Sequence, residues 1–270
     1  MKNLLLPPIL ALALSASATA STALQCDFSP YVGNYPFLGV EGITTTNPLA
    51  NTFFRQGIYH MWSFNEVEAM KSFECCIDAD PNSAMCYFGK AYASGPFLNK
   101  PTCSEEELIS ANKSVKTMSE LAAKSSLRDI ELLLVESFVA RFPSSDINGD
   151  QTLASKEYRD ILRNAVYPKD GEPTTFANDN DLLSMYAEAE MDYMASQGVD
   201  YYYEMKQLTH GEPRQESIDA IIALDTVFGS DSPDHPLAAH MMIHITEPLS
   251  PLFTNDDAPT NINDYARRGK

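Results

Sequence analysis

The chain has 270 residues, enough for one large domain or two small ones, and its 44% of hydrophobic residues can form a core. It carries 37 Asp and Glu against 19 Lys and Arg, a formal net charge of −18 at pH 7. A chain this acidic repels phosphate groups, which argues against nucleic acid and anionic membranes as partners. Basic proteins, basic peptides and metal cations remain possible partners.

The first 23 residues have the layout of a secretory signal peptide. Lys2 precedes an apolar run over residues 4–14, and small residues surround Ala20. The run is too short to cross a bilayer, and no later segment is apolar for the ~20 residues that a membrane span needs. We therefore predict a signal peptide at 1–23, no membrane span, and a secreted or lumenal protein, periplasmic if the host is bacterial.

Five cysteines follow the predicted signal: Cys26, Cys75, Cys76, Cys86 and Cys103. Export permits disulfides, and an odd number leaves at least one thiol free or paired between chains. We expect Cys75 or Cys76 to pair with Cys86, and Cys26 to pair with Cys103, although spacing alone does not determine the connectivity.

Helical periodicity dominates the chain from residue 47 onward. Apolar residues recur at helical spacing, for example at Ile130, Leu133, Leu134 and Phe138. The pattern predicts an all-α protein with an irregular segment at 24–48, a helical domain at 49–250 and a polar tail at 251–270. We expect helices at about 49–62, 66–78, 83–94, 104–123, 127–141, 155–165, 179–194, 214–228 and 236–245.

Residues 50–83 match the spacing of a tetratricopeptide (TPR) repeat, which is 34 residues long. An F-x2-Q-G-x2-H opening starts at Phe53, and Ala69, Phe73 and Pro81 follow at the later positions of the repeat. Gly57 and Ala69 are small enough to let two antiparallel helices approach closely. The pattern predicts antiparallel helical hairpins of TPR type stacked as a short solenoid. An ordinary helical hairpin is the alternative, because the later repeats are weaker.

Three segments together resemble a family of TPR-like proteins that carry an H-x4-H-x3-H-x2-E segment. They are the run from Phe54 through Asn65 to Gly95-Pro96, the run Tyr186–Met191, and the run from Asp234 through His244 to Glu247. The sequence departs from that family at Glu66, where a His is expected, and at Met241-Met242, where an aromatic pair is expected. The resemblance implies a helical-repeat fold and supplies no reaction.

The third segment also suggests a metal site. His240, His244 and Glu247 lie at positions i, i+4 and i+7, which is one stripe of a helix, and His235 lies just before them. Two imidazoles and a carboxylate can bind Zn²⁺ or another divalent transition metal, and Glu188 could complete the set. Alternatively, these histidines pack between helices and bond to the backbone or to Glu188.

Glu188 also forms an i, i+4 pair with Asp192. Because acidic side chains are mostly exposed, we expect this pair to belong to a solvated acidic face rather than to a site.

A second candidate is a calcium loop. Asp146, Asn148, Asp150, Thr152 and Glu157 occupy positions 1, 3, 5, 7 and 12 of an EF-hand loop. The glycine that the sharp turn requires at position 6 is replaced by glutamine. A connecting loop without a metal is therefore the alternative.

Motifs of nucleophilic catalysis, phosphate binding and dinucleotide binding are missing from the sequence. We therefore expect a non-enzymatic scaffold that holds a protein or peptide partner in a helical groove. The alternative is a metal-binding protein or metalloenzyme that uses the His and Glu cluster.

Overall fold

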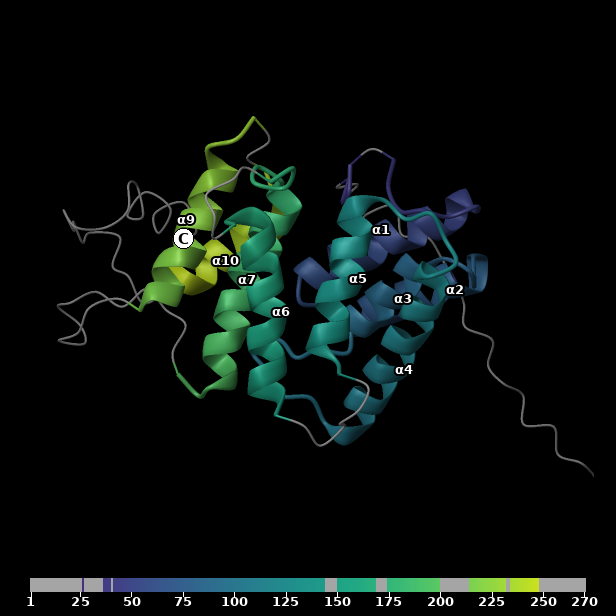
Figure 1. The fold of residues 1–270 in the computed structure, drawn as a ribbon, viewed down its shortest axis with the longest axis horizontal. Helices are drawn as coiled ribbons and strands as arrows, with labels where there is room; N and C mark the ends of the chain where they lie inside the picture. The colour runs from purple at the N-terminus through teal and green to yellow at the C-terminus, as the bar shows by residue number, and fades with distance from the viewer. Residues whose placement is uncertain are drawn as a thin grey trace, which may run out of the picture.

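The computed structural model describes residues 26, 36–39, 41–143, 150–168, 174–199, 214–231 and 234–247. Within these ranges the protein has nine α-helices and no β-strand, which confirms the expected all-α class (Figure 1). The helices are α1 (Pro48–Trp62), α2 (Glu66–Ala79), α3 (Ala84–Tyr92), α4 (Glu105–Ala122), α5 (Asp129–Arg141), α6 (Gln151–Val166), α7 (Asn180–Ser196), α9 (Gln215–Phe228) and α10 (Pro236–Thr246). The signal-peptide and tail predictions lie outside the described residues.

Capping side chains explain several of the helix starts. Asn47 caps α1 by accepting a hydrogen bond from the Leu49 amide at 3.0 Å, directly before Pro48 in the first turn. Ser104 and Glu107 form a reciprocal capping box at the start of α4. The largest deviation from the sequence prediction is at α6, which begins four residues early because Asp150 caps it.

Neighbouring helices pack against one another in chain order from α1 to α7, and α7 then packs against α9. Alternate helices also touch, since α3 packs against both α1 and α5. The last helix, α10, packs against α7, α9 and α1, so it joins the C-terminal helices to the first one (Figure 1). The end of α1 and the start of α10 therefore lie side by side, with Trp62 against His235.

Two glycines allow the first three helices to pack closely around Phe73, a fully buried residue of α2. A Cβ atom placed on Gly57 of α1 would lie 2.5 Å from the Phe73 ring, and one placed on Gly89 of α3 would come closer still. Nonbonded carbon atoms normally approach to about 3.5–4.0 Å. The ring therefore occupies the space that side chains at positions 57 and 89 would take.

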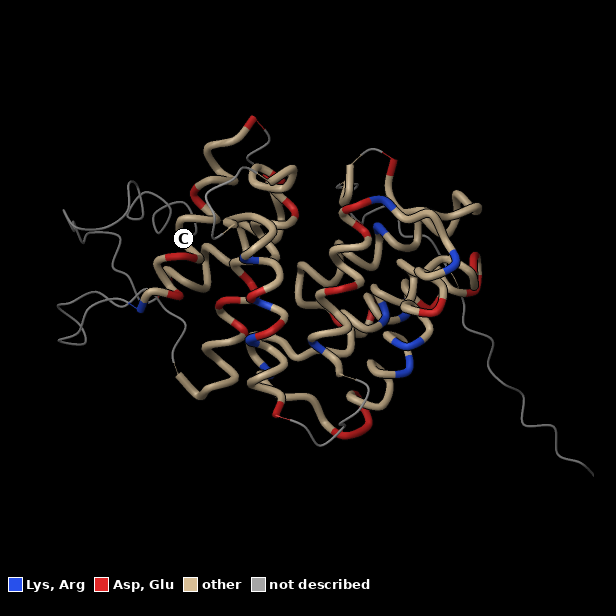
Figure 2. Tube along the Cα trace, in the orientation of Figure 1, with Lys and Arg blue, Asp and Glu red and all other residues tan. Residues whose placement is uncertain are grey.

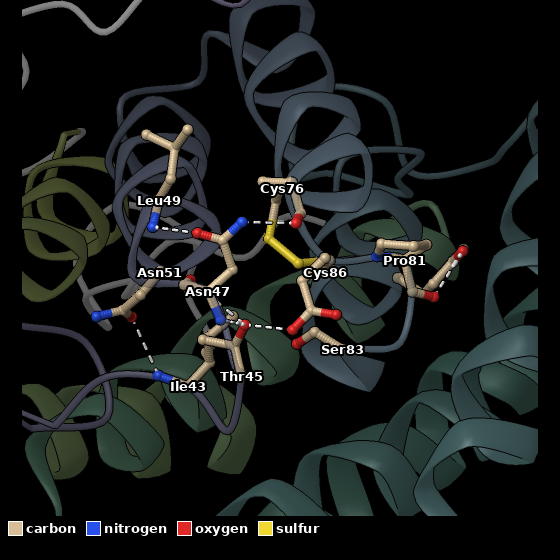
Figure 3. The surroundings of a disulfide bond; sticks show 12 residues. Ile43, Thr45, Asn47, Leu49, Asn51, Cys76, Pro81, Ser83 and Cys86 are labelled. Carbon is tan, nitrogen blue, oxygen red and sulfur yellow. Dashed lines mark hydrogen bonds between the residues drawn. A yellow bond between two sulfur atoms is a disulfide. The ribbon is translucent and has the colours of Figure 1, made fainter.

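A disulfide between Cys76 of α2 and Cys86 of α3 joins consecutive helices (Figure 3). Their Cα atoms are 5.5 Å apart, within the usual range for a disulfide. This pair confirms the prediction that Cys75 or Cys76 pairs with Cys86.

The expected pairing of Cys26 with Cys103 is wrong. Cys26 is bonded to Cys75, with 5.6 Å between Cα atoms, and Cys103 is a buried free cysteine. Cys103 lies within the α3–α4 connection, where its thiol donates to the Ser94 carbonyl oxygen at 3.6 Å. Two disulfides are compatible with an oxidising compartment such as the one that a secreted protein meets.

The helices of the described ranges contain no segment that is both long and apolar enough to cross a membrane.

Candidate functional site

Helix α7 carries four buried acidic side chains, Asp181, Glu188, Glu190 and Asp192. The expected solvated face for Glu188 and Asp192 is therefore wrong, because both residues are at most 4% exposed. Each acidic side chain meets a partner from elsewhere in the fold. Glu190 pairs with Arg159 of α6 at 3.0 Å, and acidic and basic residues adjoin on α6 and α7 (Figure 2). The partners explain how α7 can bury so much charge.

Glu188 and Asp192 belong to one buried cluster with Tyr92, Arg141 and Tyr158. The Tyr92 hydroxyl donates to Glu188, and the Arg141 guanidinium donates to Asp192 at 2.9 Å and to the Pro96 carbonyl oxygen at 2.7 Å. Burial raises the pKa of both Glu188 and Asp192, and Arg141 opposes the rise. One guanidinium neutralises one carboxylate, so the cluster favours keeping a proton on the other carboxyl group.

Solvent access argues against chemistry at this cluster. Its five side chains are all buried, so none of them can touch a substrate in this conformation. The cluster instead ties α3, α5, α6 and α7 together. Perturbed pKa values of this kind occur in structural ion-pair networks as well as in active sites.

His235 is the N-cap of α10 and has a structural role. Its Nδ1 atom accepts a hydrogen bond from the Ala238 amide at 3.3 Å, so its Nε2 atom carries the proton and donates to Asp181 at 3.1 Å. The ring is fully buried and lies against Trp62, with 4.9 Å between ring centroids. Both ring nitrogens are therefore engaged, which leaves neither for a metal ion.

His240 and His244 come together on the half-buried face of α10. Their Nε2 atoms are 3.2 Å apart, and the His240 Nδ1 atom lies 2.7 Å from the carbonyl oxygen of Trp62. Phe64 packs against both imidazole rings, at centroid distances of 4.1 Å and 5.5 Å. Burial and the neighbouring His240 lower the pKa of His244, which favours neutral imidazole.

The remaining two residues of the predicted metal set do not converge on this histidine pair. Glu188 lies in the buried cluster with Tyr92, and Glu247 is the exposed C-cap of α10. The Glu247 carboxylate lies 3.8 Å from the Nδ1 atom of His244, on the other side of the ring from Nε2. Across the described ranges, no three His, Cys, Asp or Glu side chains are grouped so that they could hold a metal ion.

The predicted calcium loop is only partly within the described residues, because Asp146 and Asn148 lie outside them. Asp150 uses its carboxylate to cap α6, accepting from the Thr152 and Leu153 amides. Glu157 is exposed seven residues further along the same helix, about 10 Å along its axis. With α6 starting here, Asp150 and Glu157 do not converge as an EF-hand requires.

A surface pocket that the sequence analysis missed lies between the start of α2 and the α3–α4 connection. Its volume is about 580 Å³. Apolar and charged side chains share its wall, including Phe64, Glu66, Val67, Met70, Phe97 and Lys100. Val67 is 66% exposed, which is unusual for a large apolar side chain. An apolar residue on the polar face of a helical projection of α2 is the signal by which the sequence could have indicated this surface.

Phe64 connects this pocket to the histidine pair, since it lines the pocket and packs on both rings. Its φ angle is +53°, in the left-handed region that non-glycine residues rarely adopt. Phe64 follows the C-cap of α1, and this conformation turns the chain into α2. Such a conformation costs roughly 1–3 kcal/mol and is more frequent near functional sites than elsewhere.

Comparisons with protein families, with curated proteins and with solved structures gave no significant match.

Proposed function

We propose that this protein is a non-enzymatic helical-repeat scaffold of TPR type, secreted or resident in a secretory compartment, that binds a peptide segment of a partner protein. The pocket beside α2 is the observation that carries the proposal. It combines a volume of about 580 Å³ with apolar walls and a few charged groups, the usual composition of a binding site.

The packing of the helices supports the repeat assignment. In a stack of helical hairpins, each hairpin contacts its neighbours, so alternate helices also meet. Helices α1, α3 and α5 follow this arrangement. Phe73, held between Gly57 and Gly89, links the first hairpin to the next helix, and Gly57 is one of the small residues of the repeat pattern.

The charged side chains around the pocket indicate which kind of peptide it binds. Lys71 is paired with Glu68 at 2.7 Å, and Lys100 is paired with Glu107, so both cations of the pocket are already neutralised. Glu66 adds a carboxylate to the pocket wall, and the whole chain has a net charge of −18. The pocket therefore favours a peptide that presents a Lys or Arg beside apolar side chains.

Panning of a phage-displayed decapeptide library on the oxidised protein tests this proposal. We expect the enriched peptides to combine apolar residues with Lys or Arg. In fluorescence polarisation with the most enriched peptide, Val67→Glu should weaken binding at least tenfold, because it places a charge among the apolar contacts. General electrostatic attraction would instead strengthen the binding of a basic peptide to this variant.

Val139→Glu is the matched control, since Val139 is 44% exposed on α5 and does not line the pocket. It should change the affinity less than twofold. Failure to enrich any peptide, or equal effects of the two substitutions, would contradict the proposal.

A further inference from the structure

We infer that His240 and His244 form a two-histidine site for a divalent first-row transition metal at the junction of α1 and α10. The inference goes beyond the peptide pocket and does not depend on it. It also differs from the five-residue set that the sequence suggested, because it excludes His235 and Glu188 and gives Glu247 a different role.

The Trp62 carbonyl group determines which nitrogen of His240 can bind a metal. Trp62 is the last residue of α1, and its carbonyl oxygen faces His240 of α10. A carbonyl oxygen only accepts hydrogen bonds, so the His240 Nδ1 atom at 2.7 Å must carry the proton. In the neutral ring, the Nε2 atom of His240 then presents a lone pair.

The distance between the two Nε2 atoms fits a shared ion. Metal–imidazole bonds are about 2.0–2.1 Å long. Two such bonds across a separation of 3.2 Å meet at an angle of about 100°, between the square-planar and tetrahedral values. The separation of the two Nε2 atoms therefore allows one ion to bond to both of them.

Binding of an ion requires no change in the number of protons on the two imidazole rings. Without metal, the Nε2–H of His244 donates to the Nε2 atom of His240, which can only accept. When an ion binds, the His244 proton moves from Nε2 to Nδ1, so the two neutral rings keep one proton each. Nδ1 is 3.8 Å from the Glu247 carboxylate, which can approach to accept that proton. Glu247 is then a positioning residue, as carboxylates behind metal-binding histidines commonly are.

The surroundings hold the site in place and leave it open on one side. Phe64 covers one side of the histidine pair, and the side chain of His244 is 19% exposed. With two protein ligands, the remaining coordination positions are available to water or to a side chain of a bound molecule. Imidazole favours Cu²⁺ over Zn²⁺ and Ni²⁺, so Cu²⁺ should bind most tightly.

Calorimetric titration of the oxidised protein with Zn²⁺ measures affinity and stoichiometry. We expect one ion per chain and at least a tenfold loss of affinity in both His240→Ala and His244→Ala. His60→Ala is the matched control, since His60 is a partly buried histidine on α1, and it should change affinity less than twofold. Absence of binding, or equal affinity in all four proteins, would overturn the inference.

Paramagnetic resonance of the Cu²⁺-loaded protein identifies the ligands directly. Two imidazole nitrogens should split the wild-type signal, and one nitrogen should remain in His244→Ala. A wild-type signal that is unchanged in His244→Ala would assign the ion to other residues and refute the site. Glu247→Gln should keep both nitrogens and weaken binding less than either His substitution, and circular dichroism confirms that the variants are folded.

Discussion

The contact between Phe73 and the glycines of α1 and α3 gives the most direct test of the fold. We predict that Gly89→Ala destabilises the protein, although alanine is the better helix former. A Cβ atom at position 89 would lie 2.2 Å from a carbon of the Phe73 ring, more than 1 Å inside normal contact. The ring is fully buried and packs on Phe54 at a centroid distance of 5.7 Å, so it has little room to retreat.

Two opposing effects set the size of the change. Replacing glycine with alanine inside a helix stabilises by roughly 0.5–1 kcal/mol. Overpacking of a tight core costs about 1–3 kcal/mol, and a displacement of over 1 Å belongs in the upper part of that range. We therefore expect Gly89→Ala to lower the free energy of unfolding by about 1–2 kcal/mol. Gly57→Ala should act in the same direction with a smaller effect, since its added Cβ atom would lie 2.5 Å from the ring.

Guanidinium chloride unfolding, followed by far-ultraviolet circular dichroism with the disulfides intact, measures this change. Phe73→Leu provides the control background, because removal of the ring should relieve the clash. In that background Gly89→Ala should become neutral or stabilising, a coupling of at least about 1 kcal/mol. If Gly89→Ala stabilises the otherwise unchanged protein by the amount that helix propensity alone supplies, the close packing of α2 and α3 is refuted.

Two further predictions concern acid stability and the free thiol. Burial alone would raise the pKa of Glu131, but hydrogen bonds from Thr44 and Arg128 outweigh it, and the pKa lies below its ordinary value. The stabilisation is complete above the unfolded pKa of about 4.3 and is lost as pH falls through the lower folded value, so Glu131→Gln should flatten the stability profile in that acidic range. A slope that is unchanged in this variant would show that Glu131 is not responsible. Burial raises the pKa of Cys103 to about 11, so iodoacetamide should label one thiol per chain only after denaturation, and rapid labelling of the native protein would contradict its burial.

Local interactions explain why the helices could be predicted from the sequence. The capping residues Asn47, Ser104 and Asp179 lie within three residues of the amides they satisfy, so the helix starts are visible without a structure. The Cys76–Cys86 disulfide could also be predicted from local sequence, since a short turn brings the end of α2 to the start of α3.

The candidate sites depended on contacts between distant parts of the chain. Spacing along α10 placed His240 and His244 on one stripe, but only packing against the end of α1 supplied the Trp62 carbonyl group that orients the first ring. The sequence predicted that Glu188 is exposed. In the fold it is buried and accepts a hydrogen bond from Tyr92 of α3, which is 96 residues away in the sequence. A charged side chain is buried only where the tertiary structure supplies a partner that offsets the loss of water, and local sequence does not record that partner.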